Sequence, residues 1–375
     1  MSKQLKTVFL ILMTTALGFG FLHQFFGSIS LNFDRLHIFL FNLCSGGTLV
    51  LYYTENLRRL SMRSRFFLGI SLIYAVLAFL QLYPAAVACS LVLCAIVESV
   101  RIKRFSFFPW NFFDGKSPVS EKFNQASLLC LSMGLLISSA VIINNEYLKL
   151  ITIPKLKLDT FFLGFSFPLS LITMSVMFAI MKPDKKSIGI FVRNLCFWTV
   201  NLGVIIFFLF ILMEKLVPQV VVTTMLFAAV VTILFLFLNN VEHIQQKNFL
   251  TSGMFFLLYT AITGIAYIII EFFPETYEHS SKLLLKLHSF ASLYGWNLSG
   301  LAVIMRFEDF PIKLHSRRVI FAHWIIVAFL APMGYYIGIF SILAVSSYFL
   351  LLYVLFFTQA KNVAVNQAPI QGKNI

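Results

Sequence analysis

Two histidines stand at the start of apolar segments, each within the tetrapeptide Leu-His-x-Phe: His37 in 36–48 and His288 in 287–300. Imidazole is the commonest metal ligand in proteins, and its charge changes near neutral pH. An ionisable side chain inside a membrane segment is a functional-site hypothesis by default. We therefore expect both histidines to lie at similar depth in a membrane and to act as ligands, with His23, near the end of the first apolar segment, as a reserve ligand.

Small residues follow each histidine at helical spacing. The first segment places Cys44 and Thr48 seven and eleven positions on, and the second places Ser292, Gly295 and Ser299 four, seven and eleven positions on. Such positions share one helix face. One imidazole above a stripe of small residues leaves room for a flat ring between helices, which is the arrangement that haem b requires. Small residues also line ordinary helix–helix contacts in membranes, so a packing interpretation stands beside the haem interpretation.

The elements that position these residues follow from the composition. The chain has 375 residues, of which 59% are hydrophobic and 12% are charged, whereas soluble domains have about 25% charged residues. A membrane-spanning helix needs about 20 apolar residues. The sequence therefore predicts an all-α polytopic integral membrane protein of about twelve transmembrane helices, with one transmembrane domain over 1–358 and a polar, disordered cytoplasmic tail over 359–375.

The predicted spans are long apolar runs separated by short polar loops. The last run, 319–357, is too long for one helix at about 1.5 Å per residue, and Ala331-Pro332-Met333-Gly334 breaks it into two. The ten earlier spans are expected at about 7–26, 36–54, 66–83, 84–100, 126–144, 160–181, 188–213, 217–238, 249–273 and 285–305.

The net charge of +14 is explained by topology. With both termini in the cytoplasm, most of the 29 basic residues fall in cytoplasmic segments, as the positive-inside rule expects. The excess of basic residues therefore needs no nucleic-acid partner. We expect a multi-pass protein of the bacterial cytoplasmic (inner) membrane, surrounded by lipid. The aromatic cluster 105–113 in the loop after the fourth span is expected to be an interfacial anchor, with a re-entrant or gating segment as the alternative.

This arrangement resembles subunit I of the haem–copper oxidases. The resemblance rests on twelve spans, cytoplasmic termini and outer-side histidines on the second and tenth spans, and it implies that His37 and His288 hold a low-spin haem. The sequence departs from the family where the other metal ligands would lie. Phe290 replaces the second histidine of the tenth span, the sixth span has no histidine, and 193–198 in the seventh has no histidine pair. The resemblance thus implies a one-haem protein in electron transfer or small-gas (O2 or NO) handling, with a redox partner or quinone and without an oxidase centre.

A secondary transporter is the alternative. Twelve spans with cytoplasmic termini also resemble the major facilitator arrangement, but the basic loop 55–59 lacks that family's glycine–aspartate–arginine–glycine pattern. Proton-coupled carriers bury carboxylates, and here Glu98 and Glu271 lie near the ends of spans. A carrier of a lipid, an apolar solute or a zwitterionic solute therefore remains open. No metalloprotease, nucleophile or phosphate-loop motif is present, so enzyme activity is left undecided.

Overall fold

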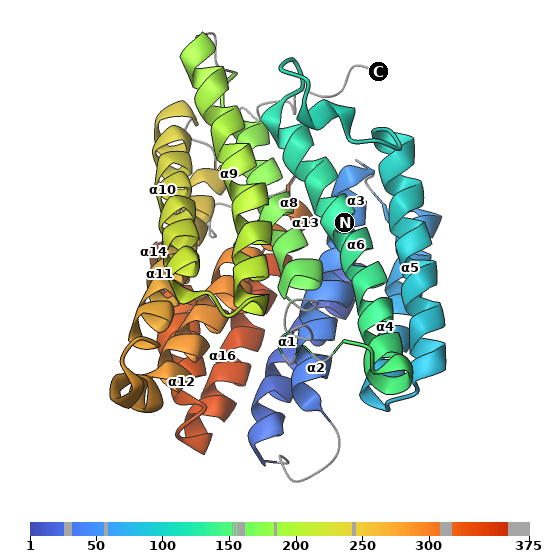
Figure 1. Ribbon diagram of the computed structural model, residues 1–375, viewed down its shortest axis with the longest axis vertical. Helices are drawn as coiled ribbons and strands as arrows, with labels where there is room; N and C mark the ends of the chain where they lie inside the picture. Colours follow the sequence, from blue (N-terminus) through green and yellow to red (C-terminus); the bar gives the residue numbers. More distant parts are fainter. Residues whose placement is uncertain are drawn as a thin grey trace. The chain divides into compact units, whose positions relative to one another are not determined.

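The computed structural model describes residues 1–25, 32–55, 59–151, 153, 155, 162–183, 186–241, 245–307 and 317–358, and within these ranges the chain is helical without a β-strand (Figure 1). Ten helical segments of the described residues are long and apolar enough to cross a membrane. The predicted all-α polytopic membrane fold is confirmed. The side of the membrane on which the termini lie, and the kind of membrane, stay predictions.

Most spans are single helices, and several contain a π-helical stretch. In chain order the elements are α1 (Lys3–Phe25), α2 (Phe33–Ile38), η1 (Phe39–Gly47), α3 (Thr48–Thr54), α4 (Met62–Phe79), α5 (Tyr83–Arg104), η2 (Trp110–Phe112), α6 (Val119–Ile143), η3 (Asn144–Leu148), η4 (Phe162–Ser166), α8 (Phe167–Ile180), α9 (Ser187–Leu212), α10 (Leu216–Asn240), α11 (Gln245–Ile270), α12 (Pro274–Phe290), η5 (Ala291–Asn297), α13 (Leu298–Met305), α14 (Arg317–Ile325), η7 (Ile326–Leu330), α15 (Ala331–Met333) and α16 (Gly338–Phe357).

The predicted tenth span begins earlier than expected. The helix starts at Pro274 rather than near residue 285 and continues through η5 and α13. Proline is favoured in the first turn of a helix because its missing N–H needs no partner there. Residues 274–286 are too polar for a span, which is why the sequence indicates a loop, but they are helical. The predicted break in the last run is confirmed, because α15 ends at Met333 and α16 begins at Gly338.

The chain forms two compact units. Within the described residues, unit 1 comprises Met1–Ser117, Asn124–Ile172 and Gly334–Phe357, and unit 2 comprises Pro118–Phe123, Thr173–Met333 and Thr358. The predicted tail over 359–375 lies outside the described residues. In unit 1, α1 packs against α2, η1 and α16 (Figure 1). In unit 2, α11 packs against α10, α12, η5 and α13. Each unit thus contains one helix packed against the segment that carries one of the two histidines.

Close helix crossings in each unit depend on glycine. In unit 1 a side chain on Gly134 of α6 would collide with the backbone of Gly164 in η4, and in unit 2 a side chain on Gly300 would collide with Thr173. Membrane helices associate through such small residues, because lipid provides no hydrophobic drive between helices.

Candidate functional site

His37 of unit 1 is oriented by a backbone carbonyl. It lies in α2, and its Nδ1 is 2.8 Å from the carbonyl oxygen of Ala16 on α1. A carbonyl oxygen only accepts, so Nδ1 carries the proton and donates it. The neutral ring therefore has its lone pair on Nε2, which is the form in which imidazole binds a metal.

His288 of unit 2 repeats this geometry. Its Nδ1 donates to the carbonyl oxygen of Thr260 on α11 at 2.9 Å. The same reasoning puts the lone pair of the neutral ring on Nε2. The two predicted ligands thus have the same tautomer and the same kind of partner, each on the preceding long helix of its own unit.

A glycine accompanies each carbonyl at the same spacing. Gly20 lies four residues after Ala16, and Gly264 lies four residues after Thr260. A Cβ atom on Gly20 would come within 2.9 Å of His37 Nδ1, and one on Gly264 within 3.0 Å of His288 Nδ1. Both rings therefore lie directly against the glycine of the neighbouring helix. A methyl group on Gly20 would displace the His37 ring, and one on Gly264 would require the His288 ring to give by a few tenths of an ångström.

A π-helical stretch follows each histidine. η1 begins two residues after His37, and η5 begins three residues after His288. A π-helical turn is rare and occurs frequently at functional sites. η4 lies at the corresponding place in the sixth span. The sequence gives no reliable signal for these stretches, and they extend the match between the two histidine segments from the tetrapeptide to the backbone.

The small residues after His37 pack within unit 1. Cys44 is fully buried. The Thr48 hydroxyl donates to the carbonyl oxygen of Cys44 at 2.6 Å, which satisfies it within its own helix. The Thr48 hydroxyl therefore has its partner within unit 1, and the role of Cys44 and Thr48 in lining a haem stays a prediction.

The small residues after His288 pack in a similar way. A side chain on Gly295 would collide with the ring of Phe256 on α11. The Ser299 hydroxyl donates to the carbonyl oxygen of Gly295 at 2.7 Å, while Ser292 is partly exposed. The close approach of α11 is what the packing interpretation predicts, and haem lining by these residues also stays a prediction. The side chain of His23 lies outside the part of the chain that the structure describes.

His323 of α14 is a fully buried histidine. Its Nε2 is 2.7 Å from the carbonyl oxygen of Tyr294, a residue of η5. Its ring stacks on Phe249 at 5.8 Å and contacts Phe256 at 4.7 Å. His323 thus binds the π-helical stretch that follows His288. This contact depends on backbone register, so spacing in the sequence does not reveal it.

Unit 1 also contains a small cavity of 60 Å³. At its wall the Tyr74 hydroxyl lies 2.6 Å from the Ser138 hydroxyl. Arg35 and Glu146 bring opposite charges to the same cavity. Its full lining is Arg35, Phe39, Tyr74, Ala78, Tyr83, Ser138, Val141, Ile142, Asn145 and Glu146. The volume suits a few waters or a very small solute rather than a larger ligand.

No cluster of three or more histidine, cysteine, aspartate or glutamate side chains within the described ranges could hold a metal ion. Haem iron takes only one or two protein ligands, so a haem does not require such a cluster. The matched histidines therefore remain the best candidates for ligands.

Comparison with protein-family models, with curated proteins and with solved structures finds no match. The fold alone therefore gives the class: a polytopic α-helical membrane protein. Any more specific assignment depends on the geometry of the two histidine segments.

Proposed function

We propose that this protein is a membrane b-type haem protein in which His37 and His288 would bind haem iron, and that it acts in electron transfer or small-gas handling. One observation carries the proposal. Each histidine donates its Nδ1 proton to a backbone carbonyl, at 2.8 Å and 2.9 Å. Histidines that bind metal almost always donate the other ring N–H to such a partner, which fixes the tautomer and makes the ligating nitrogen more basic.

The chain's own groups fit this role. Ala16 and Thr260 supply the orienting carbonyls, and Gly20 and Gly264 leave space for the rings. Bound haem would supply a one-electron redox centre or a site for a diatomic gas. The protein's part is to hold each imidazole in the neutral Nδ1–H form and at a fixed orientation.

The proposal does not extend to oxygen reduction. Phe290, two residues after His288, is buried in unit 2, and a phenyl group cannot coordinate iron. The position that holds the second tenth-span ligand in the resembled family is therefore apolar here. His37 and His288 therefore provide ligands for haem iron of one kind only, with histidine ligation.

Optical spectra of the detergent-purified protein, oxidised and dithionite-reduced, test the proposal. We expect a Soret band and sharp reduced α and β bands that are lost in the His37→Ala, His288→Ala double variant. His279→Ala is the matched control, because His279 is an exposed histidine on the same helix as His288. A protein that is colourless when expressed with haem available would contradict the proposal, as would a spectrum that the double variant leaves unchanged.

The cavity of unit 1 favours a second candidate, a carrier of a small zwitterionic solute. Arg35 and Glu146 at one cavity match the opposite charges of such a solute. Glycine uptake by proteoliposomes is the test, with Arg35→Gln as the variant. If the purified protein is colourless, takes up glycine, and takes up less glycine when it carries Arg35→Gln, the carrier function is supported. If there is no uptake, glycine is excluded as the solute.

A further inference from the structure

The loop between α5 and α6 presents an aromatic surface. Four of its side chains are exposed: Phe107 (78%), Phe108 (47%), Trp110 (66%) and Phe113 (67%). The rings of Phe108 and Trp110 lie 4.4 Å apart. We call residues 105–117 the aromatic loop. Large exposed apolar side chains grouped in this way mark an interaction surface.

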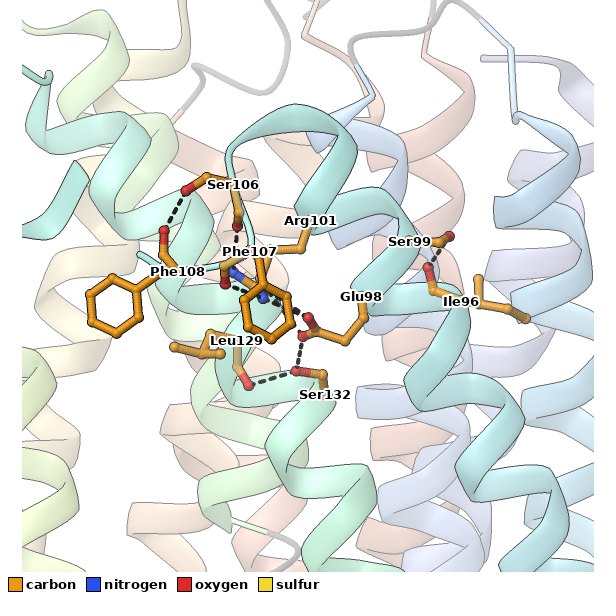
Figure 2. Close-up of polar contacts among 9 residues, drawn as sticks. All are labelled: Ile96, Glu98, Ser99, Arg101, Ser106, Phe107, Phe108, Leu129 and Ser132. Atoms are coloured by element: carbon orange, nitrogen blue, oxygen red, sulfur yellow. Dashed lines mark hydrogen bonds and ion pairs between the residues drawn. The ribbon is translucent and has the colours of Figure 1, made fainter. Parts of the chain in front are cut away.

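A partly buried ion pair holds the start of this loop. Arg101 of α5 is 3% exposed, and its guanidinium lies 2.6 Å from the Glu98 carboxylate. The same guanidinium donates to the carbonyl oxygens of Ser106 at 3.0 Å and Phe107 at 2.9 Å (Figure 2). The charge of Arg101 is thus neutralised by Glu98, while its remaining donors fix the backbone of the loop.

Glu98 extends this connection to the next helix. Its other carboxylate oxygen accepts from the hydroxyl of Ser132 on α6 at 2.6 Å (Figure 2). One connected network therefore joins α5, α6 and the loop between them. Because Arg101 bonds two backbone carbonyls of the loop while Glu98 bonds both Arg101 and Ser132, this network gives the loop a defined conformation.

Local hydrogen bonds order the rest of the loop. The Ser106 hydroxyl donates to the Phe108 carbonyl oxygen. Near the end of the loop the Asp114 carboxylate accepts from the backbone N–H of Lys116 at 2.9 Å and from the Ser117 hydroxyl at 3.2 Å. The exposed aromatic rings therefore lie on a backbone whose conformation is fixed by hydrogen bonds within the loop.

The chain itself determines where the aromatic loop lies. It joins α5 and α6, which are both long and apolar enough to cross a membrane, so it must meet one membrane surface. Lys103, Arg104 and Lys116 around it are exposed. Tryptophan concentrates at the level of lipid headgroups, and basic residues are attracted to anionic leaflets.

We propose that the aromatic loop is a preformed docking surface that inserts into the headgroup layer of an anionic bilayer. The aromatic rings enter the interface, and the exposed basic side chains meet lipid phosphates. The Glu98–Arg101 pair and Ser132 act as positioning groups. This inference is independent of haem binding.

Fluorescence quenching of Trp110 in reconstituted vesicles tests the proposal. The signal of Trp110 is obtained as the difference between the wild-type protein and Trp110→Phe, a substitution at an exposed site. In vesicles of phosphatidylcholine with phosphatidylglycerol, we expect brominated lipids to quench this signal and aqueous iodide to leave it largely unquenched. Without phosphatidylglycerol, we expect iodide quenching to rise.

A pair of serine variants tests the positioning groups. Ser132→Ala removes the hydroxyl that reaches Glu98 and should increase iodide quenching of Trp110. Ser99→Ala is the matched control, because Ser99 lies exposed on the same helix as Glu98 and its hydroxyl donates to the carbonyl oxygen of Ile96 at 2.7 Å (Figure 2). Equal quenching in the two variants would show that Ser132 does not position the loop.

Two results would overturn the proposal. Strong quenching by iodide with none by brominated lipid would place the loop in water. Protection from both quenchers would mean that a second copy or another protein covers the loop.

Discussion

At the scale of single residues, the surroundings of His37 and His288 share more than the Leu-His-x-Phe tetrapeptide. Both rings donate Nδ1–H to a carbonyl, and both lie against a glycine four residues after that carbonyl. A structural histidine needs only a satisfied hydrogen bond, whereas a ligand also needs a fixed orientation. The glycines are therefore the residues through which the proposed role can be tested without changing a ligand.

Replacing Gly20 should disturb His37 and little else. The Cβ of Gly20→Ala would lie 2.9 Å from His37 Nδ1, so the ring must move. Overpacking of this kind costs about 1–3 kcal/mol. We expect a lower melting temperature and a weakened or shifted Soret band, measured by thermal unfolding and optical spectroscopy in detergent.

Gly18→Ala is the control on the same helix, since a Cβ there would meet nothing within 4 Å. It should leave both the spectrum and the stability unchanged. If Gly20→Ala and Gly18→Ala gave the same spectrum, Gly20 would not position a haem ligand.

The Tyr74 hydroxyl gives a prediction about stability alone. Tyr74→Phe removes the hydrogen bond to Ser138, 2.6 Å long in a buried site, and such bonds contribute about 1 kcal/mol. The expected result is a modest fall in melting temperature. Tyr353→Phe is the control, because Tyr353 is 54% exposed, and it should leave the melting temperature unchanged. An equal fall in melting temperature in both variants would show that the Tyr74 hydrogen bond does not stabilise the protein.

At the scale of elements, apolar length predicts the helices because every backbone group in lipid must be satisfied within the segment. That is why the ends of most spans agree with the sequence. Apolar length does not predict η1 and η5, because a π-helical turn changes the backbone register of a helix without changing the length of its apolar segment. It also misses the polar helical start of α12, residues 274–286, which is helical although it is too polar to span a membrane.

Helix crossings make a prediction at this scale. Gly134→Ala adds a methyl group that would collide with the backbone of Gly164, so α6 and η4 must separate. We expect a clear loss of thermal stability or of monodisperse protein in size-exclusion chromatography. Gly69→Ala on α4, where a Cβ meets nothing within 4 Å, should be tolerated, and an unaffected Gly134→Ala protein would show that this crossing is not tight.

At the scale of the whole molecule, composition and charge predict class and topology, while the candidate site depends on contacts that the sequence leaves open. His37 and His288 are recognisable from sequence as a repeated tetrapeptide, yet their carbonyl partners lie 21 and 28 residues away. His323 joins η5 through a carbonyl 29 residues away. Long-range hydrogen bonds of this kind follow from helix packing, so no local pattern predicts them.

The positive-inside rule predicts the orientation of the whole protein in the membrane. The exposed positions Lys116 and Lys282 lie in segments predicted on opposite sides of the membrane. A membrane-impermeant maleimide should label Lys282→Cys in intact cells and Lys116→Cys only in inverted vesicles. Cys44, Cys94 and Cys196 are buried and should stay unlabelled, so the wild-type protein measures the background. The reverse pattern would place both termini outside, and it would put both histidines at the cytoplasmic end of their spans, where their proposed redox partners would differ.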